Sequence, residues 1–229
     1  MKSPSQHLYE LHGIKPPASN QEAAFEKQLI ESVGGAAAFA EEISPLLQRR
    51  KTCIHEAAHA VSFWQVGQQI ERIAVFKSGG GVCYTHPRRT LDSDFCFCTA
   101  AGIAGELRAM NIPAPHHPDL VAYLKVLHRP EFMPGVRTLK DDESDLQSLL
   151  KFHMRPHRKP STLSRRKQRR FWNLAARDVI EADRRLAPDW ELVVCLADLL
   201  DKIHTLDEAQ LQELFSWYTY AKNREAGHA

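Results

Sequence analysis

The sequence has no apolar run of about eighteen residues, the length that a membrane-spanning helix needs. Its first twenty residues contain one early lysine with no apolar stretch behind it, so a secretory signal is not expected. The P-loop pattern G-x-x-x-x-G-K-[ST], whose backbone cradles nucleotide phosphates, is also missing. The five cysteines are odd in number and lie in apolar segments, which favours reduced thiols. We therefore expect a cytoplasmic protein that neither spans a membrane nor binds ATP.

Composition excludes little else. The 229 residues are 43% hydrophobic and 25% charged, which is typical of a folded protein. A net charge of +2 gives no general reason for a polyanionic partner, so nucleic acid is not expected. The strongest local bias is the basic run 155–170, which we interpret as a solvated loop and helix face with only a weak hint of anion binding.

The chain is predicted to be mainly α-helical with one small β element. Residues 1–20 read as a flexible N-terminal arm. Helical periodicity and breaking residues predict helices over about 20–47, 47–66, 93–111, 119–127, 139–153, 164–185, 188–203 and 207–223. Thr205 and Glu208 are spaced as a capping box before the last helix, and Trp64, Trp190 and Trp217 lie at apolar positions expected in the core.

A β-hairpin is predicted between the second and third of these helices. Alternation in residues 70–77, with even and odd positions on opposite faces, indicates one strand, and residues 82–85 indicate the other. The glycine-rich stretch 78–81 would connect them.

The pattern H-E-x-x-H occurs at residues 55–59 on the second predicted helix. Residues four apart share a helix face, so the imidazoles of His55 and His59 can reach one metal ion. Glu56 follows the first of them and can act as general base on a water held at that metal. The bland alternative is two surface histidines on an ordinary helix. Small apolar neighbours argue against it, since a buried imidazole needs a partner.

A catalytic zinc site needs a third protein ligand. Two carboxylates further along the chain are candidates, Glu106 at the end of a helix rich in small residues and Asp145 near the start of another. Spacing does not choose between them. His116 and His117 are adjacent in a proline-rich loop and are interpreted as surface residues.

Four motifs, in the same order, resemble the peptidase domain of the FtsH family of membrane-anchored AAA zinc proteases. That family has H-E-A-G-H, a hairpin ending in G-Y-T, the helix L-A-G-R-A-A-E and the ligand segment S-N-D-L-Q. This chain has H-E-A-A-H (55–59), V-C-Y-T (82–85), A-G-I-A-G-E (101–106) and E-S-D-L-Q (143–147). Segments 179–182, 196–200, 205–207 and 211–214 resemble the terminal helices of the family, so the likeness covers about residues 48–216.

The resemblance implies a helical zincin-type peptidase domain over residues 21–229, with a zinc-site part (48–154) and a C-terminal helical bundle (155–229). It implies that Asp145 is the third Zn²⁺ ligand and that Glu106 is a supporting acid. It also implies that the hairpin holds an extended substrate by β-strand addition. The substrate-binding residues would be Gly80, Gly81, Val82, Cys83 and Tyr84.

The chain departs from the family in several places. Ala58 replaces a glycine, Ser144 an asparagine and Ile103 an arginine, and the stretch from Glu106 to Asp145 is longer. The ATPase module and the membrane anchor are missing, so the expected activity is ATP-independent hydrolysis of peptides or unfolded segments. Two alternatives stay open: a catalytically inactive peptidase-like binding module with a structural or sensory zinc site, and an unrelated helical protein with a chance motif. The oligomeric state is left open.

Overall fold

The computed structural model describes residues 44–76, 80–86, 92–109, 120–121, 124, 139–154 and 163–226. The chain divides into two compact units, residues 1–50 and 51–229, and nearly all of the first lies outside the described residues. The predicted arm (1–20), the helix expected before residue 44, the loop with His116 and His117, and most of the helix expected over 119–127 also lie outside them.

The fold is mainly helical, as predicted, with a small antiparallel sheet. The helices are α4 (Ser44–Gln65), α5 (Asp92–Ala109), α7 (Leu139–His153), α8 (Arg165–Leu186), the 3-10 turn η3 (Ala187–Asp189), α9 (Trp190–Ile203) and α10 (Glu208–Ala226). Each predicted helix in the described ranges is present, with ends within three residues of the expected ones. The described helices include none that is long and apolar enough to cross a membrane.

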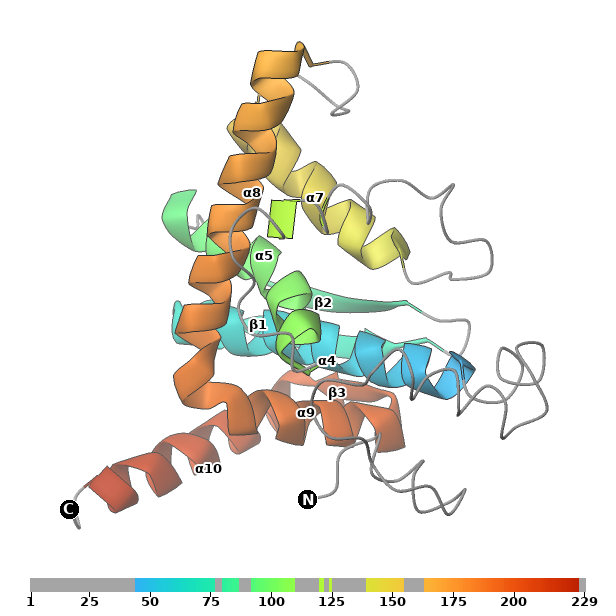
Figure 1. Cartoon of the computed structure of the whole chain (residues 1–229). Helices are drawn as coiled ribbons and strands as arrows, with labels where there is room; N and C mark the ends of the chain where they lie inside the picture. The colour runs from blue at the N-terminus through green and yellow to red at the C-terminus, as the bar shows by residue number, and fades with distance from the viewer. Residues whose placement is uncertain are drawn as a thin grey trace, which may run out of the picture. The chain divides into compact units, whose positions relative to one another are not determined.

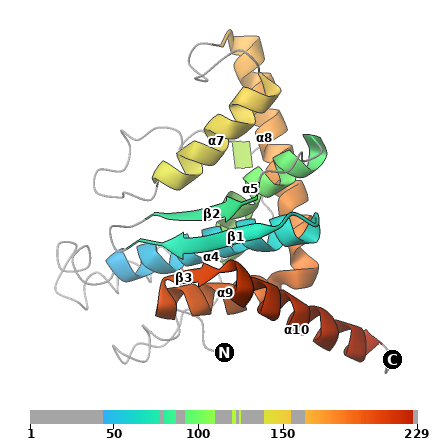
Figure 2. The same cartoon turned by 180° about the vertical axis from the view of Figure 1, so that it is seen from behind.

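The sheet has three strands in the order β2-β1-β3. The predicted hairpin is confirmed as β1 (Ile70–Val75) paired with β2 (Gly81–Thr85). The third strand, β3 (Thr205–Asp207), was not predicted, and it pairs with the other edge of β1 from more than a hundred residues away (Figure 2). Strand β2 therefore lies at an edge of the sheet.

The predicted alternation along β1 is only partly right. Glu71 and Arg72 are both exposed, whereas Ile73, Ala74 and Val75 are all buried. The pairing register with β2 shifts between Ile70 and Arg72, as in a β-bulge, which offsets the side-chain alternation by one position. Beyond the bulge both faces of β1 are covered, so the strand has no solvent face to keep polar.

Helix α4 is central rather than amphipathic. Every residue from 52 to 62 is buried, so the apolar stripe expected on one face extends around the whole helix. Helix α5 packs against both α7 and α8, and α7 also contacts α8, so these three helices form one layer of the second unit (Figure 1). The polar residues of the H-E-x-x-H motif are thus held inside the core.

The capping box of the last helix is shifted by two residues from the predicted one. Backbone N–H of Gln210 donates to Asp207 Oδ1, and backbone N–H of Asp207 donates to Gln210 Oε1, both at 3.0 Å. Thr205 instead belongs to β3. The expectation for Trp217 was also wrong, because its side chain is 62% exposed while Phe215, two positions earlier, faces the core.

Candidate metal centre

His55 and His59 lie one turn apart on α4 and are buried, with 2% and 8% of their surface exposed. Glu56 between them is 3% exposed. The alternative of two surface histidines is therefore wrong. Two imidazoles in a core need polar partners, since burying them unpaired costs several kcal/mol.

Helix α5 supplies a hydrogen-bond partner for the Nδ1 atom of each imidazole ring. His55 Nδ1 lies 3.0 Å from Glu106 Oε1, and His59 Nδ1 lies 2.7 Å from the backbone carbonyl oxygen of Cys98. Both partners are acceptors, so each Nδ1 carries the proton and donates it. In the neutral tautomer that results, both Nε2 atoms present a lone pair to the interior.

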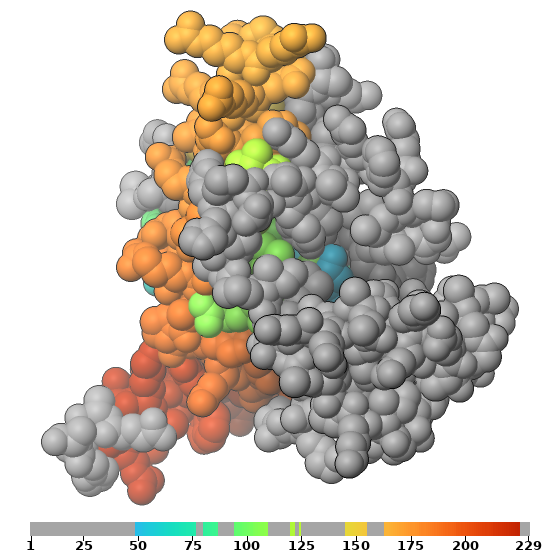
Figure 3. All heavy atoms as spheres, viewed as in Figure 1, coloured from blue at the N-terminus to red at the C-terminus, as the bar shows by residue number. Residues whose placement is uncertain are grey.

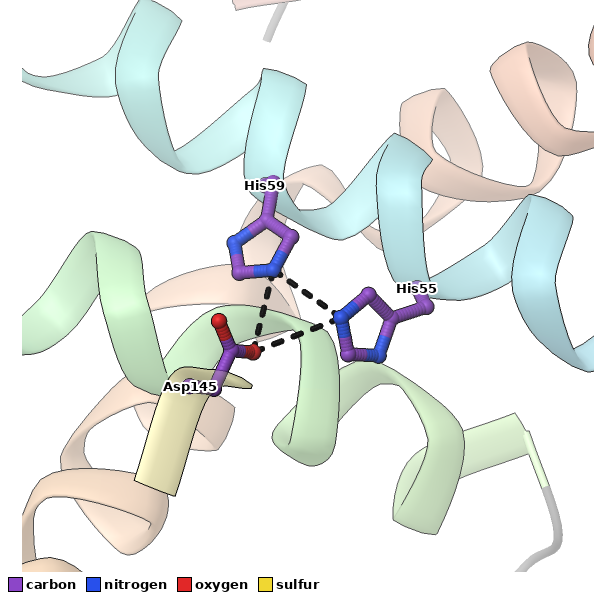
Figure 4. Close-up of side chains that lie close together, drawn as sticks. All are labelled: His55, His59 and Asp145. Carbon is purple, nitrogen blue, oxygen red and sulfur yellow. Dashed lines mark hydrogen bonds and ion pairs between the residues drawn. The ribbon is translucent and has the colours of Figure 1, made fainter. Parts of the chain in front are cut away.

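Asp145 from α7 completes the group (Figure 4). Its Oδ2 atom lies 3.3 Å from His55 Nε2 and 3.1 Å from His59 Nε2, and the two nitrogens are 3.1 Å apart. Asp145 is not a solvated acid in the first turn of its helix. It is the seventh residue of α7, and 15% of its side chain is exposed.

The spacing of these three atoms fits a bound cation. Ligands about 2.0–2.1 Å from a tetrahedral ion are about 3.3–3.4 Å from one another, close to the 3.1–3.3 Å seen here. Asp145 Oδ2 is buried and receives no well-aligned hydrogen bond from the described residues. Two lone pairs and a carboxylate oxygen facing one another repel unless positive charge lies between them. The chemistry of the donor set therefore fits a metal ion.

The pKa shifts of His59 and Asp145 also indicate that positive charge stabilises this group. Burial would lower the pKa of His59, but the Asp145 carboxylate more than offsets this, and the pKa is raised. Burial would likewise raise the pKa of Asp145, yet the two histidines hold it below its ordinary value. Both directions have one cause, which is that positive charge beside the buried Asp145 carboxylate is favourable.

Glu106 contacts His55 at Nδ1, the ring nitrogen that does not face the three donor atoms. Its Oε1 accepts a hydrogen bond from His55 Nδ1, while its Oε2 forms an ion pair with Lys51 Nζ at 2.5 Å. Lys51 lies one turn before His55 on α4 and was not singled out from the sequence. The sequence did not choose between these two carboxylates as the third ligand. The structure places Asp145 beside the Nε2 atoms of both histidines and Glu106 beside His55 Nδ1.

Glycines let the surrounding elements approach these side chains closely. A Cβ atom added to Gly102 of α5 would lie 2.4 Å from His55 Cε1 and Nε2, and one added to Gly105 would lie 2.7 Å from Ala58 Cβ. A Cβ atom on Gly81, the first residue of β2, would lie 2.4 Å from Glu56 Cγ. The edge strand therefore begins against the carboxylic acid of the motif.

The remaining hairpin residues line the start of β2 without joining the donor group. Gly80 has a positive φ of 79°, which favours glycine, and its carbonyl accepts a hydrogen bond from Phe76. Tyr84 is 42% exposed with the Arg72 guanidinium over its ring, and Val82 is half-buried. Burial raises the pKa of Cys83 well above its ordinary value, so its thiol is neutral beside the site.

A second group that could hold a metal was missed in the sequence. Cys96, His153 and Asp178 come from α5, α7 and α8, and no short spacing links them. His153 Nε2 lies 2.5 Å from Asp178 Oδ2 and 3.8 Å from Cys96 Sγ. A separation of 2.5 Å is that of a strong hydrogen bond and is too short for two ligands of one ion. The spacing therefore favours the first group as the metal centre and a buried hydrogen bond between His153 and Asp178 for the second.

The chain matches no protein-family model and no curated protein. Of the residues that the sequence singled out, His55, His59 and Asp145 converge on one point, with Glu56 on the same helix and Glu106 behind the first histidine.

Proposed function

We propose that this chain is a zinc metalloendopeptidase that hydrolyses peptides or unfolded protein segments without ATP. The observation that carries the proposal is the convergence of His55 Nε2, His59 Nε2 and Asp145 Oδ2 within 3.1–3.3 Å of one another. Three protein ligands with a fourth position left for water or substrate are the usual arrangement of catalytic zinc sites. The ordered motifs that resemble FtsH-family peptidase domains support the same assignment.

Zinc is the metal that we propose for this donor set, because its two histidines belong to an H-E-x-x-H pattern. Two imidazoles and one carboxylate suit Zn²⁺, and the thiols near the site are neutral, with burial raising the pKa of Cys98 to about 12. When bound, zinc would act as a Lewis acid that polarises the scissile carbonyl and makes water acidic enough to deprotonate near neutral pH.

Glu56 would be the general base. Its side chain lies directly against Gly81, the first residue of β2, because a residue without a Cβ atom lets the strand approach it this closely. From there it would take a proton from the attacking water and pass it to the leaving amine. His55 and His59 would stay neutral at Nε2, because Glu106 and the Cys98 carbonyl hold the proton of each ring on Nδ1.

The substrate would be an extended chain. Strand β2 pairs with β1 and lies at a sheet edge, and an edge strand offers backbone groups to which a peptide can add. Gly80, Gly81, Val82, Cys83 and Tyr84 would form that binding edge, with the scissile bond near Gly81 and Glu56. No P-loop occurs in the sequence, so the chain would act on segments that are already unfolded.

The test compares the parent with Glu56→Gln and Asp145→Ala. Metal content is measured by elemental analysis after zinc is added back, and cleavage is followed with an unfolded protein substrate. The parent is expected to hold about one zinc and to cleave, Glu56→Gln to hold the same zinc and cleave at least about a hundredfold more slowly, and Asp145→Ala to lose most of its zinc.

Two results would overturn the proposal in different ways. No zinc in the parent would make the motif accidental or decayed. Full zinc content without cleavage of any unfolded substrate would instead identify a binding module whose zinc site is structural or sensory.

A further inference from the structure

Residues 165–177 of α8 carry an exposed cationic face, called here the arginine face. Its members are Arg165, Arg166, Lys167, Arg169, Arg170 and Arg177. The opposite side of the helix is buried, with Phe171 and Ala175 fully enclosed and Trp172 6% exposed. Because that buried side anchors the helix, the arginine face is fixed toward the solvent, and in Figure 3 the start of α8 (light orange) lies at the surface of the face shown.

Within the described part of the chain, these cations have almost no carboxylate partners. No ion pair is formed there by residues 165–170, and Arg177 reaches only Asp178 Oδ1, at 3.8 Å. Arginines at the end of the same helix behave differently: Arg184 pairs with Glu181 at 2.6 Å, and Arg185 with Asp94 at 3.3 Å. Positive charge is therefore neutralised at one end of α8 and left available at the other.

The arginine face contains a shallow hollow. A hollow of about 510 Å³ is lined by Arg166, Arg169, Arg170, Asn173, Leu174 and Arg177. These positions recur every three or four residues, so they share one side of the helix over about 16 Å. Four arginines, one asparagine and one leucine of a single helix therefore line one open, elongated hollow.

The chemistry of the hollow favours phosphate. Guanidinium groups bind phosphate oxygens in a bidentate manner that lysine cannot reproduce, and every cation that lines the hollow is an arginine. An anionic membrane surface fits less well, because Leu174 is the only apolar residue in the lining and insertion needs an apolar face. Unpaired strands also fit less well, because their binding sites stack bases on exposed aromatic rings and both aromatic residues of this segment are buried.

We propose that the arginine face binds the phosphate backbone of duplex nucleic acid without reading its sequence. This inference is independent of the metal centre, and it revises the expectation that nucleic acid is not a partner. The basic run in the sequence gave only a weak hint, because charge alone does not show whether side chains share a face or are neutralised. Residues Arg155, Arg158 and Lys159 of that run lie outside the described residues.

The test measures binding of a duplex DNA of about 20 base pairs to the full chain by fluorescence anisotropy at several salt concentrations. About four phosphate contacts predict a slope of log K against log salt near −4. The triple variant Arg166→Gln, Arg170→Gln, Arg177→Gln is expected to reduce that slope by about 3 and to weaken binding at least about tenfold at low salt.

A charge-matched control separates the arginine face from bulk charge. The triple variant Arg184→Gln, Lys202→Gln, Arg224→Gln removes three exposed cations elsewhere and is expected to bind as the parent does. Circular dichroism of both variants verifies folding. Equal losses in the two triples, or no binding by the parent at low salt, would overturn the proposal. So would tighter binding of single-stranded DNA, polyglutamate or anionic phospholipid vesicles than of the duplex.

Discussion

Replacing Gly102 by alanine should weaken metal binding at the candidate centre without unfolding the protein. The added Cβ would lie 2.4 Å from His55 Cε1 and Nε2, whereas non-bonded carbons are normally about 3.5–4.0 Å apart. The ring or α5 must therefore move by about 1 Å, although ligand geometry must be kept within about 0.5 Å. We expect Gly102→Ala to weaken metal binding about 10- to 100-fold, the range found when the surroundings of a ligand are disturbed.

The matched control is Gly105→Ala, one turn further along α5. Its Cβ would lie 2.7 Å from Ala58 Cβ, so the same two helices are overpacked without contact with a ligand. Each variant gains the same helix propensity and should lose about 1–3 kcal/mol of unfolding free energy from overpacking. Zinc affinity is measured by competition with a chromophoric chelator, and stability by urea unfolding of the metal-free proteins.

Two outcomes of comparing Gly102→Ala with Gly105→Ala would contradict this prediction. Parent-like zinc affinity in Gly102→Ala would show that the ring of His55 does not need its present position. Equal losses of affinity in both variants would show that helix spacing in general, rather than this contact, controls the site.

Three further predictions concern the surroundings of the site and the fold. Lys51→Met should weaken zinc binding about tenfold in the chelator competition, because Lys51 orients the carboxylate that receives the first histidine's Nδ1 proton, and Lys51→Arg should restore it. Gly81→Ala should keep the zinc and lose at least about tenfold in cleavage rate, because its Cβ would collide with Glu56; unchanged cleavage would contradict this. Burial would raise the pKa of Asp189, but Lys222 and other donors lower it below its ordinary value, so its contribution to stability is present above about pH 4 and is lost as the pH falls through the lowered pKa. Asp189→Asn should therefore cost about 1–3 kcal/mol at pH 7 in urea unfolding and flatten the loss of stability below pH 4, and an unchanged acid profile would count against it.

Local features of the chain were predictable because their causes are local. The ends of α7 coincide with the predicted ones, and α5 and α8 differ by one or two residues, since periodicity and breaking residues act within a turn or two. The β1–β2 hairpin was predictable for the same reason. The third strand was not, because three residues carry no periodicity and β3 exists only through its pairing with β1.

Burial was harder to predict than secondary structure. Trp217 and Phe215 are both aromatic residues of α10, and only the packing of the helix decides that Phe215 faces inward. The same holds for the arginine face, where the sequence shows the charges but not which of them are paired.

The sequence by itself determined the two histidines of the candidate group, because residues one turn apart on a helix share a face. It could not choose the third member of the candidate group, since Glu106 and Asp145 are 51 and 90 residues beyond His55 and spacing carries no information over such distances. Only the tertiary structure decided it, by packing α5 through Gly102 and Gly105 close to α4 and placing α7 across the inner nitrogens. Convergence of donors from separate helices depends on how those helices pack, and packing depends on the whole chain at once.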